Sequence, residues 1–286
     1  MIYVNCCICN KDITAPFIIR DSLKLAKCQI CGLVYVNPQI EPKDLKGVYL
    51  NNYYRSNNSK ELGYDNYLAE QLNIEKTSSK RLDIIEKIIR PGKLLDVGCA
   101  YGFFMRVANG RGWQSIGVEL SEKAADYAKN SLGLNVLCGD IETVSLSNNS
   151  FNLITLWDVI EHLSKPRLVL EKLHDILVDG GLLALTTPDI ESLPAKLTGQ
   201  RWLGFKSSAE HLWYFSKQTI TRLLEKTGFK VEKIFYVGKY VNLGMFVDRL
   251  SRYIPPVGKL SFLLHRRRPS FYVNPYDIIC VIAQRG

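Results

Sequence analysis

The apolar positions of this chain are most regular between residues 93 and 188, where short apolar runs alternate with stretches of helical periodicity. The runs predict strands at 93–97, 113–119, 135–138, 151–157 and 181–187, and the periodic stretches predict helices at 103–111, 121–131 and 166–177. A further helix is expected at 216–227, with strands at 229–237 and 277–283. This alternation is typical of a doubly wound α/β fold, in which helices cover both faces of a mostly parallel sheet.

The segments outside this region have weaker patterns. Residues 65–89 carry apolar positions at helical spacing, with a break expected near Thr77, and they open the main domain at 65–286. Residues 41–64 lack periodicity and are expected to form a linker or cap. Between the last two strands, residues 239–276 predict an inserted helical segment with an amphipathic helix.

The first forty residues contain two Cys-x-x-Cys pairs, Cys6 with Cys9 and Cys28 with Cys31. Each pair offers two sulfur ligands from one tight turn, and two such turns complete the tetrahedral site that Zn²⁺ prefers. We therefore expect a zinc-ribbon-like domain at 1–40. Its metal should be structural, because four protein ligands leave no open coordination position.

The sequence also bears on the compartment. No apolar run approaches the roughly 20 residues that span a bilayer, and the first residues lack a basic stretch followed by an apolar one. We therefore expect a cytoplasmic protein, in which thiols stay reduced and the eight cysteines favour metal binding over disulfides.

The net charge is +9, and much of it falls late in the chain, at Arg249, Arg252, Lys259 and the run 266–268. Charge confined to one segment is more typical of a solvated or membrane-facing surface than of sequence-specific nucleic-acid binding. Apolar residues lie between these cations, so 239–276 is expected either to pack as a subdomain or to contact a membrane peripherally.

Acidic residues stand at the ends of three successive predicted strands. Asp96 precedes a glycine-rich turn at 98–102, which lacks the third glycine of a dinucleotide-binding loop. An acid beside this turn would repel a pyrophosphate but suit a cationic ligand such as a sulfonium. Glu119 is placed to accept both hydroxyls of a ribose, and Asp140 to accept the exocyclic amine of adenine, with Ile141 against the ring.

Residues 93–188 resemble the class I methyltransferases that use S-adenosylmethionine (SAM). The matching stretches include Leu94-Leu95-Asp96-Val97-Gly98-Cys99-Ala100-Tyr101-Gly102 and Phe151-Asn152-Leu153-Ile154-Thr155-Leu156-Trp157-Asp158. The family usually has glycine where Ala100 stands. The resemblance implies a seven-stranded sheet whose last strand is antiparallel and inserted. The predicted cofactor-binding residues are Asp96, Gly98, Cys99, Ala100, Tyr101, Gly102, Glu119, Leu120, Asp140, Ile141 and Trp157.

The acceptor half of the site is expected where Asp158, Glu161 and His162 follow the fourth predicted strand. His162 and His211 are both candidate general bases, and we prefer His211 slightly because its stretch resembles methyltransferases of small molecules and sugars. An alternative is that Glu161 and His162 only open the next helix and fix the loop. A further alternative is a Mg²⁺ ion held by Asp158, Glu161, His162 and His211, as in methyltransferases with a similar acid-x-x-Glu-His stretch.

These features favour a SAM-dependent methyltransferase acting on a hydroxyl of a small molecule or carbohydrate. A zinc ribbon before such a domain resembles sugar and surface-polysaccharide methyltransferases, so a sugar nucleotide or lipid-linked glycan is the expected acceptor. Two other functions remain open. One is an RNA methyltransferase that uses the ribbon and basic segment, although the ribbon carries few cations. The other is a non-catalytic module that binds SAM.

Overall fold

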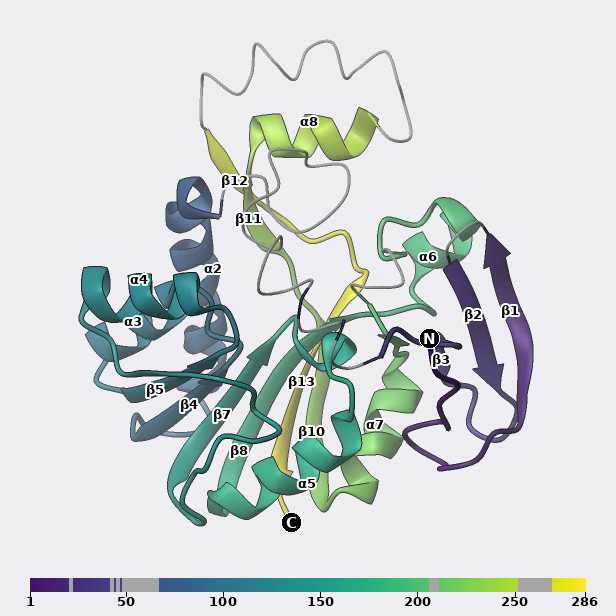
Figure 1. Ribbon diagram of the computed structural model, residues 1–286. Helices are drawn as coiled ribbons and strands as arrows, with labels where there is room; N and C mark the ends of the chain where they lie inside the picture. The colour runs from purple at the N-terminus through teal and green to yellow at the C-terminus, as the bar shows by residue number, and fades with distance from the viewer. Residues whose placement is uncertain (21–22, 42–43, 45–46, 48–66, 206–210, 252–268) are drawn as a thin grey trace.

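The computed structural model describes residues 1–20, 23–41, 44, 47, 67–205, 211–251 and 269–286 (Figure 1). Most of the expected linker at 41–64 therefore lies outside the described residues, as do Arg252, Lys259 and the run 266–268. None of the helices in the described ranges has the length and apolar character that crossing a membrane requires.

A seven-stranded sheet forms the centre of the main domain. Its strands are β4 (Lys93–Val97), β5 (Gln114–Glu119), β6 (Val136–Cys138), β7 (Phe151–Trp157), β8 (Leu177–Pro188), β10 (Phe229–Tyr236) and β13 (Ile278–Arg285). In space they follow the order β10-β13-β8-β7-β4-β5-β6. β13 runs antiparallel to both neighbours, and the other pairs are parallel. The expected mostly parallel sheet with an inserted antiparallel last strand is confirmed.

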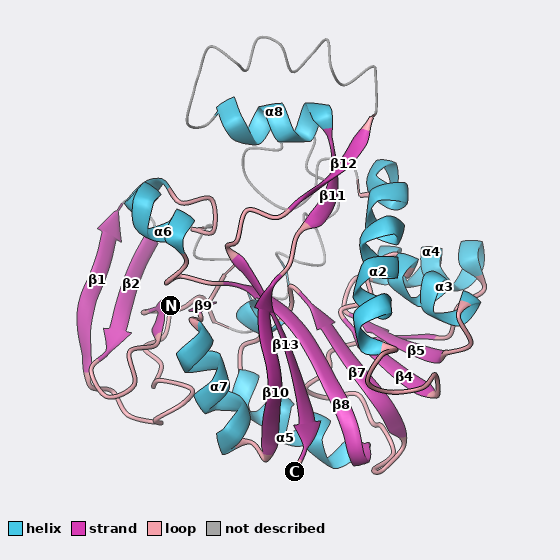
Figure 2. Ribbon diagram, turned by 180° about the vertical axis from the view of Figure 1, so that it is seen from behind, coloured by secondary structure: helices cyan, strands magenta, loops and turns pink. Residues whose placement is uncertain are grey.

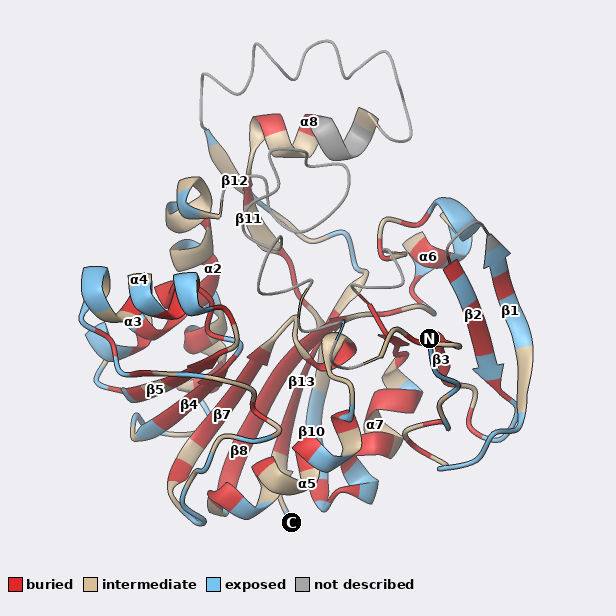
Figure 3. Ribbon diagram, viewed as in Figure 1, coloured by how far each residue is buried: buried red, intermediate tan, exposed pale blue. Residues whose placement is uncertain are grey.

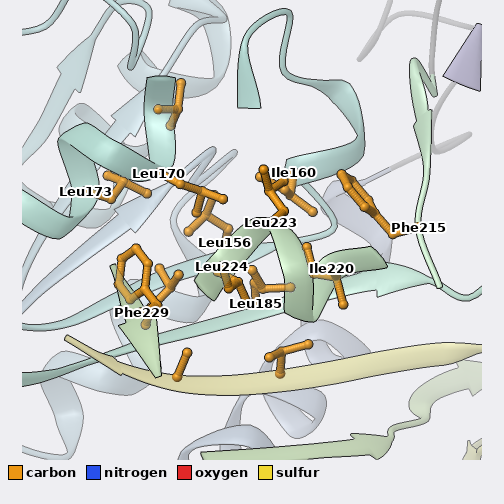
Figure 4. Close-up of a cluster of buried hydrophobic side chains, with 14 of the residues drawn as sticks. Leu156, Ile160, Leu170, Leu173, Leu185, Phe215, Ile220, Leu223, Leu224 and Phe229 are labelled. Carbon is orange, nitrogen blue, oxygen red and sulfur yellow. The ribbon is translucent and has the colours of Figure 1, made fainter. Parts of the chain in front are cut away.

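Helices cover both faces of this sheet (Figures 1 and 2). They are α2 (Gln71–Ile85), α3 (Phe103–Gly110), α4 (Glu122–Leu132), α5 (Pro166–Ile176) and α7 (Lys217–Lys226). Leu94 and Leu153 pack with apolar side chains of α2 and α3 on one face. Leu156 and Leu185 pack with those of α5 and α7 on the other face (Figure 4). The central strands are consequently buried along most of their length (Figure 3).

Local sequence sets the ends of these helices. The Ser121 side chain accepts a hydrogen bond from the Ala124 N–H at the start of α4, and Gly133 ends that helix in a left-handed conformation. Ser216 and Thr219 form a capping box at the start of α7. Both serines therefore satisfy backbone N–H groups that the first turn of a helix leaves unpaired.

The expected break in the helix near Thr77 was wrong, since α2 continues through this position. The hydroxyls of Thr77 and Ser78 donate hydrogen bonds to the carbonyl oxygens of Asn73 and Ile74, one turn earlier. Such bonds are compatible with a continuous helix, although the same hydroxyls also favour turns. A short 3-10 helix, η1 (Leu68–Glu70), precedes α2.

The N-terminal cysteine segment forms a second sheet that a distant part of the chain completes. Its strands are β1 (Thr14–Arg20), β2 (Leu23–Cys28), β3 (Val34–Val36) and β9 (Trp213–Tyr214), in the order β1-β2-β3-β9. Helix α6 (Leu193–Thr198) and the 3-10 helix η3 (Gly199–Arg201) lie in the same stretch of chain that leads to β9. The side chains of Cys6, Leu33 and Tyr35 belong to the same buried cluster as those of α5 and α7.

The segment between the last two strands contains a two-stranded ribbon as well as the expected helix. Strands β11 (Lys239–Asn242) and β12 (Ser270–Val273) pair antiparallel, and helix α8 (Leu243–Ser251) follows β11. The ribbon extends beyond the edge of the main sheet (Figure 1). It is attached to α2, because the Tyr240 N–H donates to Thr77 Oγ1 at 2.9 Å.

Substituting Gly102 by alanine tests how closely α3 and α4 approach. Gly102 has a φ of 79°, and an added Cβ would lie 2.4 Å from Leu134 Cδ1. We expect Gly102→Ala to lower the free energy of unfolding by about 2–4 kcal/mol, because left-handed strain and overpacking add. Gly133→Ala is the matched control, with a φ of 65° and no atom within 4 Å, and should cost about 1 kcal/mol. Urea titration measures both, and equal losses would show that the contact with Leu134 relaxes freely.

Candidate active site

The loop after β4 brings backbone groups to the carboxyl edge of the sheet. Gly98 and Ala100 have positive φ angles of 69° and 50°. Glycine adopts this conformation readily, whereas it costs other residues roughly 1–2 kcal/mol, which accounts for the glycine usual at position 100 in the family that this stretch resembles. The Gly98 N–H donates to the Val118 carbonyl at 2.8 Å and ties the loop to β5. A Cβ on Gly98 would lie 2.7 Å from Val159 Cγ2, so the loop runs close to the segment after β7.

The Glu119 carboxylate, at the end of β5, organises this loop. Its Oε2 accepts the Ala100 N–H at 2.9 Å, and its Oε1 accepts the Ser121 N–H at 2.8 Å. The residue is buried, and burial raises the pKa of the Glu119 carboxyl, although the N–H groups of Ser121 and Ala100 oppose this effect. Each oxygen retains a further acceptor position, so the carboxylate suits two hydroxyls of one ligand.

The loop after β6 is held in place by its own hydrogen bonds and by a lysine of α5. Asp140 Oδ1 accepts the Glu142 N–H at 2.9 Å. The Lys172 ammonium, on α5, donates to the carbonyl oxygens of Ile141 and Val144. Sequence reasoning missed this role of Lys172, because the lysine lies about one strand and one helix further along the chain. The contact fixes the loop that presents Asp140 and Ile141.

A single cavity joins the three strand ends to the segment after β7. Of the predicted cofactor-binding residues, those that line it are Gly98, Ala100, Glu119, Leu120, Asp140, Ile141 and Trp157. Asp96, Cys99, Tyr101 and Gly102 are not among the lining residues. The Cys99 side chain is directed into the protein, since its Sγ would meet a Cβ on Gly117 at 2.5 Å. Cys99 could therefore contact a ligand only through its backbone.

Asp96 lies beneath the loop and is 2% exposed. Thr155 Oγ1 donates to its Oδ1 at 2.7 Å. Burial raises the pKa of the Asp96 carboxyl to about 7, against the opposing effects of the Thr155 hydrogen bond and the Arg81 charge. The Asp96 carboxyl therefore titrates near neutral pH, and the positive charge of Arg81 lowers its pKa.

Asp158 lines the cavity directly after β7 and has a strained backbone. Its φ is 56°, an uncommon value for a residue with a side chain. Thr186, on the neighbouring strand β8, holds it there: Thr186 Oγ1 donates to Asp158 Oδ1 at 2.7 Å, and the Asp158 N–H lies 3.0 Å from the same hydroxyl oxygen. The hydroxyl therefore fixes both the backbone and the side chain of Asp158 at the cavity.

The two candidate bases lie together. The rings of His162 and His211 meet edge to face with their centroids 4.8 Å apart. His162 lines the cavity, whereas His211 is 7% exposed and is not among the lining residues. His211 Nδ1 lies 3.1 Å from the Gly204 carbonyl oxygen, which can only accept, so neutral His211 carries its proton on Nδ1 and its lone pair on Nε2.

Glu161 is buried beside the histidines. It is 1% exposed, and neither carboxylate oxygen has a hydrogen-bond partner among the described residues. Burial, followed by the charge of Asp158, raises the pKa of the Glu161 carboxyl well above its ordinary value. Glu161 and His162 lie in a 3-10 helix, η2 (Ile160–His162). The next α-helix, α5, begins at Pro166, so this pair does not open it, while the Glu161 carbonyl accepts the Leu212 N–H at 2.9 Å.

The expected Mg²⁺ ligand set does not assemble as a group. Candidate ligand atoms of Glu161, His162 and His211 lie within 4.8 Å of one another, but Asp158 is outside this group and bonds to Thr186 instead. Mg²⁺ prefers an octahedron of oxygen ligands, which two imidazoles and one carboxylate do not provide. The geometry therefore does not support the Mg²⁺ interpretation.

Sequence reasoning missed Arg81, which lines the cavity from α2. Its guanidinium lies 4.4 Å from the centroid of the Trp157 ring, and its Nε is buried without a hydrogen-bond partner among the described residues. Asn73, Thr77 and Arg81 recur every four residues and all line the cavity. This recurrence of polar residues was the available signal, because residues four apart share one helix face.

The four predicted zinc ligands come together. The sulfur atoms of Cys6, Cys9, Cys28 and Cys31 all lie within 4.8 Å of one another, and the Sγ atoms of Cys6 and Cys31 are 3.5 Å apart. A tetrahedral zinc site with Zn–S bonds of about 2.3 Å requires sulfur atoms roughly 3.8 Å apart, so the arrangement fits the ion. Cys7, between the first pair, is not part of this group.

Both cysteine pairs use the same turn. The Asn10 N–H donates to the Cys6 carbonyl at 2.8 Å, and the Gly32 N–H donates to the Cys28 carbonyl at 2.9 Å. Asn10 and Gly32 have positive φ angles of 53° and 82°. These are residue types that adopt this conformation at low cost, so each pair closes a tight turn that directs two sulfurs to one point.

Comparison with known proteins identifies the type of domain. A family model described as "Methyltransferase domain" matches residues 68–234, more than half of the chain. A ubiquinone biosynthesis O-methyltransferase of Coxiella burnetii is 33% identical over 114 residues, which cover 37% of this chain and 49% of that protein. An uncharacterized protein of Methanocaldococcus jannaschii is 26% identical over 162 residues, 56% of this chain and 62% of that protein. The chain thus spans about half the length of the first of these relatives.

Solved structures share the fold. A SAM-dependent methyltransferase from Archaeoglobus fulgidus superposes with a TM-score of 0.52 and 18% identity, covering 76% of this chain and 98% of that chain. The YcgJ protein of Bacillus subtilis superposes with a TM-score of 0.50 and 15% identity, covering 72% of this chain and 98% of that chain. At these identities the likeness concerns the fold alone.

The pKa of Asp96 leads to a test by pH. Its folded-state pKa of about 7 lies above its ordinary value of 3.8, so the folded protein binds the proton more tightly than the unfolded chain. Its contribution to stability is therefore present at pH 4 and is lost as pH rises through 7. We expect Asp96→Asn to be more stable than the wild type at pH 8, with the difference shrinking towards pH 5, in urea titrations without SAM. Asp179→Asn, at a side chain that is 97% exposed, is the control; a pH-independent difference for Asp96→Asn would contradict the assignment.

Proposed function

The chain belongs to the family of SAM-dependent methyltransferases, and from that premise we propose that it transfers the methyl group of SAM to a hydroxyl of a small-molecule acceptor. The observation that carries this proposal is that one cavity is lined both by His162 and Asp158 and by the strand-end residues Gly98, Glu119 and Asp140. A donor held on one wall then meets an acceptor and a base on the other. Bringing these groups into one cavity supplies the proximity and orientation that methyl transfer needs.

The residues on the donor wall have complementary roles in this proposal. Glu119 accepts the ribose hydroxyls, Asp140 accepts the adenine amine, and Ile141 packs against the ring. Arg81 pairs with the carboxylate of the methionine part, because its buried Nε lacks a partner and a guanidinium matches a carboxylate. The buried acids Asp96 and Glu119 provide negative charge beneath a cofactor that carries a sulfonium and an ammonium.

The histidine pair acts on the acceptor. SAM supplies an electrophilic methyl group on a positively charged sulfur. The acceptor oxygen forms a bond to the methyl carbon as the carbon–sulfur bond breaks, and the hydroxyl proton passes to the imidazole of His162. His211 positions the His162 ring, since the two rings are in contact and the Gly204 carbonyl holds His211 in place. This order reverses our preference from sequence, because His162 and not His211 lines the cavity.

The acceptor is proposed to be a small polar molecule. The cavity is also lined by Asn73 and Thr77 of α2 together with Lys239 and Tyr240 of β11. These hydrogen-bonding side chains suit a hydroxylated acceptor, for which a sugar nucleotide or a lipid-linked glycan remains our expectation. The name of the Coxiella burnetii relative refers to an O-methyltransferase, which agrees with attack by oxygen.

The cysteine group is proposed to bind a structural zinc ion. Four thiolates fill the coordination sphere, so the ion would leave no position for substrate. The short sheet of β1, β2 and β3 has little apolar core of its own, and metal ligation commonly stabilises segments of this size.

The choice between the two histidines can be tested by substitution. We expect His162→Gln to lower the rate of methyl transfer about 10²–10⁴-fold, the range lost when a general base is removed, with SAM affinity retained. His211→Gln should have a smaller effect, because it leaves the base in place. Single-turnover transfer of labelled methyl measures the rate, and calorimetry measures the affinity. A larger loss for His211→Gln than for His162→Gln would return the role of base to His211.

The role of Arg81 can be tested with a pair of ligands. We expect Arg81→Gln to weaken SAM binding about tenfold or more, since a charge-assisted hydrogen bond contributes roughly 1.5–3 kcal/mol. Decarboxylated SAM lacks the paired group and should bind the variant and the wild type equally. Lys80→Gln, on the same helix but outside the cavity lining, is the control in calorimetric titrations. An equal loss for both ligands would remove the assignment to the carboxylate.

The acceptor class can be identified with labelled methyl SAM and a fractionated cell extract. We expect label in small-molecule, sugar-nucleotide or lipid-linked glycan fractions, and none with the His162→Gln protein. Label found only in RNA would overturn the proposed acceptor. Binding of SAM without label in any fraction would instead indicate a non-catalytic module.

A further inference from the structure

The segment that carries His211 is part of the cysteine sheet. Strand β9 pairs with β3, with Tyr214 opposite Val34 and Trp213 opposite Tyr35. The Val36 N–H adds a hydrogen bond to the Leu212 carbonyl at 2.9 Å. The chain from 212 to 214, directly after His211, is thus held by a strand that begins three residues after Cys31.

The same segment also holds the other histidine. The Leu212 N–H donates to the Glu161 carbonyl at 2.9 Å, and Trp213 Nε1 donates to the Leu163 carbonyl at 2.8 Å. The two acceptors are the residues directly before and after His162 in the sequence. Residues 212 to 214 therefore join β3 to η2, in contact with both.

The two cysteine turns are connected to the main domain at their backbone carbonyls. On α7, Arg222 Nη1 donates to the Cys31 carbonyl at 3.1 Å, and Lys226 Nζ donates to the Ile8 carbonyl at 3.1 Å. The Cys28 N–H bonds to the Leu33 carbonyl at 2.8 Å, so the second turn leads directly into β3. The second turn is therefore joined to β3, and both turns are joined to α7.

Among the described residues, no backbone hydrogen bond joins the cysteine segment to the strand ends of the donor wall. Apart from Arg81 of α2, the residues of this wall come from the ends of β4, β5 and β6, at one side of the main sheet. The cysteine sheet lies beyond the opposite side of the molecule, near α6 and α7 (Figure 1). The backbone hydrogen bonds that hold the histidines are thus separate from those of the strand ends, while Cys6 and Cys28 share a buried apolar cluster with Val97 and Val118.

From this arrangement we propose that the metal-bound cysteine site positions His162 and His211, so that loss of the metal disables the acceptor half while leaving SAM binding intact. The catalytic consequence rests on the proposed function of the histidines, but the positioning itself does not. Cys6, Cys9, Cys28 and Cys31 are positioning residues in this proposal. They act through β3, then β9, then η2.

The first experiment compares the zinc-loaded full chain with the same protein after removal of the metal by a chelator. Hydrogen exchange read by mass spectrometry should become at least about tenfold faster at 211–216 and 158–164, because the bonds between β3, β9 and η2 loosen. Exchange at 114–120, in β5, should stay within about twofold, and so should the SAM dissociation constant from calorimetry. Nitrogen-15 spectra of labelled histidine should show movement of the His162 and His211 signals with the His174 signal unchanged.

Matched variants separate the effect of losing the metal from the effect of losing the contact between β9 and η2. Cys9→Ser removes one ligand and should reproduce the metal-free exchange pattern, whereas Cys7→Ser, in the same turn but outside the ligand group, should behave as the wild type. Cobalt titration, followed by thiolate-to-metal absorption, reports whether each variant binds metal. Trp213→Phe keeps all four ligands but loses the bond to Leu163, and should speed exchange at 158–164 alone. Its control is Trp113→Phe, which loses a comparable Nε1 bond to Glu86.

Three results would overturn the proposal. Unchanged exchange and unchanged histidine signals after metal removal would show that the cysteine site does not hold the histidines. A parallel loss of SAM binding, or faster exchange in β5, would show general unfolding in place of local coupling. Exchange that rises equally in Trp213→Phe and Trp113→Phe would remove β9 from the pathway. Faster exchange at 211–216 with methyl transfer retained would support the coupling and contradict the proposed role of the histidines.

Discussion

The parallel pairing of β4 with β5 on one side and with β7 on the other is the constraint on which the rest of the site depends. Its register places Val97 opposite Val118 and Leu156, so the three strands end at the same level. Glu119 and Asp158, which are distant in sequence, therefore meet at one edge. Because both faces of the sheet are buried, a shift of register by a single residue would reverse which side chains face each helix layer.

This edge also concentrates buried acids, which gives the protein without ligand an unfavourable electrostatic state. Burial raises the pKa values of Asp96, Glu119 and Glu161, which means that their charged forms are poorly solvated. Thr155 and two backbone N–H groups offset part of this cost. A cationic ligand would offset more of it, so the groups whose burial is unfavourable are the ones that favour cofactor binding.

The sequence predicted the main sheet and the four-cysteine group well, because both depend on local signals: apolar runs bounded by turns, and ligand pairs at fixed spacing. It did not predict β9 or the β11–β12 ribbon, since strands of two to four residues carry too few positions for an alternating pattern. Arg81 and Lys172 were missed for a different reason. Lys172 bonds to the loop after β6 and Arg81 lies over Trp157 at the end of β7, and both contacts arise from the packing of α5 and α2 onto the sheet.

The β11–β12 ribbon leaves the main sheet between β10 and β13, whose ends are already paired at Tyr236 and Ile279. Closure of the sheet therefore does not depend on the length of the insertion, and each doubling of a flexible loop costs only about 0.6 kcal/mol. An ancestral enzyme with this architecture could gain, lose or exchange the insertion without disturbing the nucleotide-binding strands. Diversification of substrates would then proceed by remodelling one appendage, while the methyl-donor chemistry is inherited unchanged.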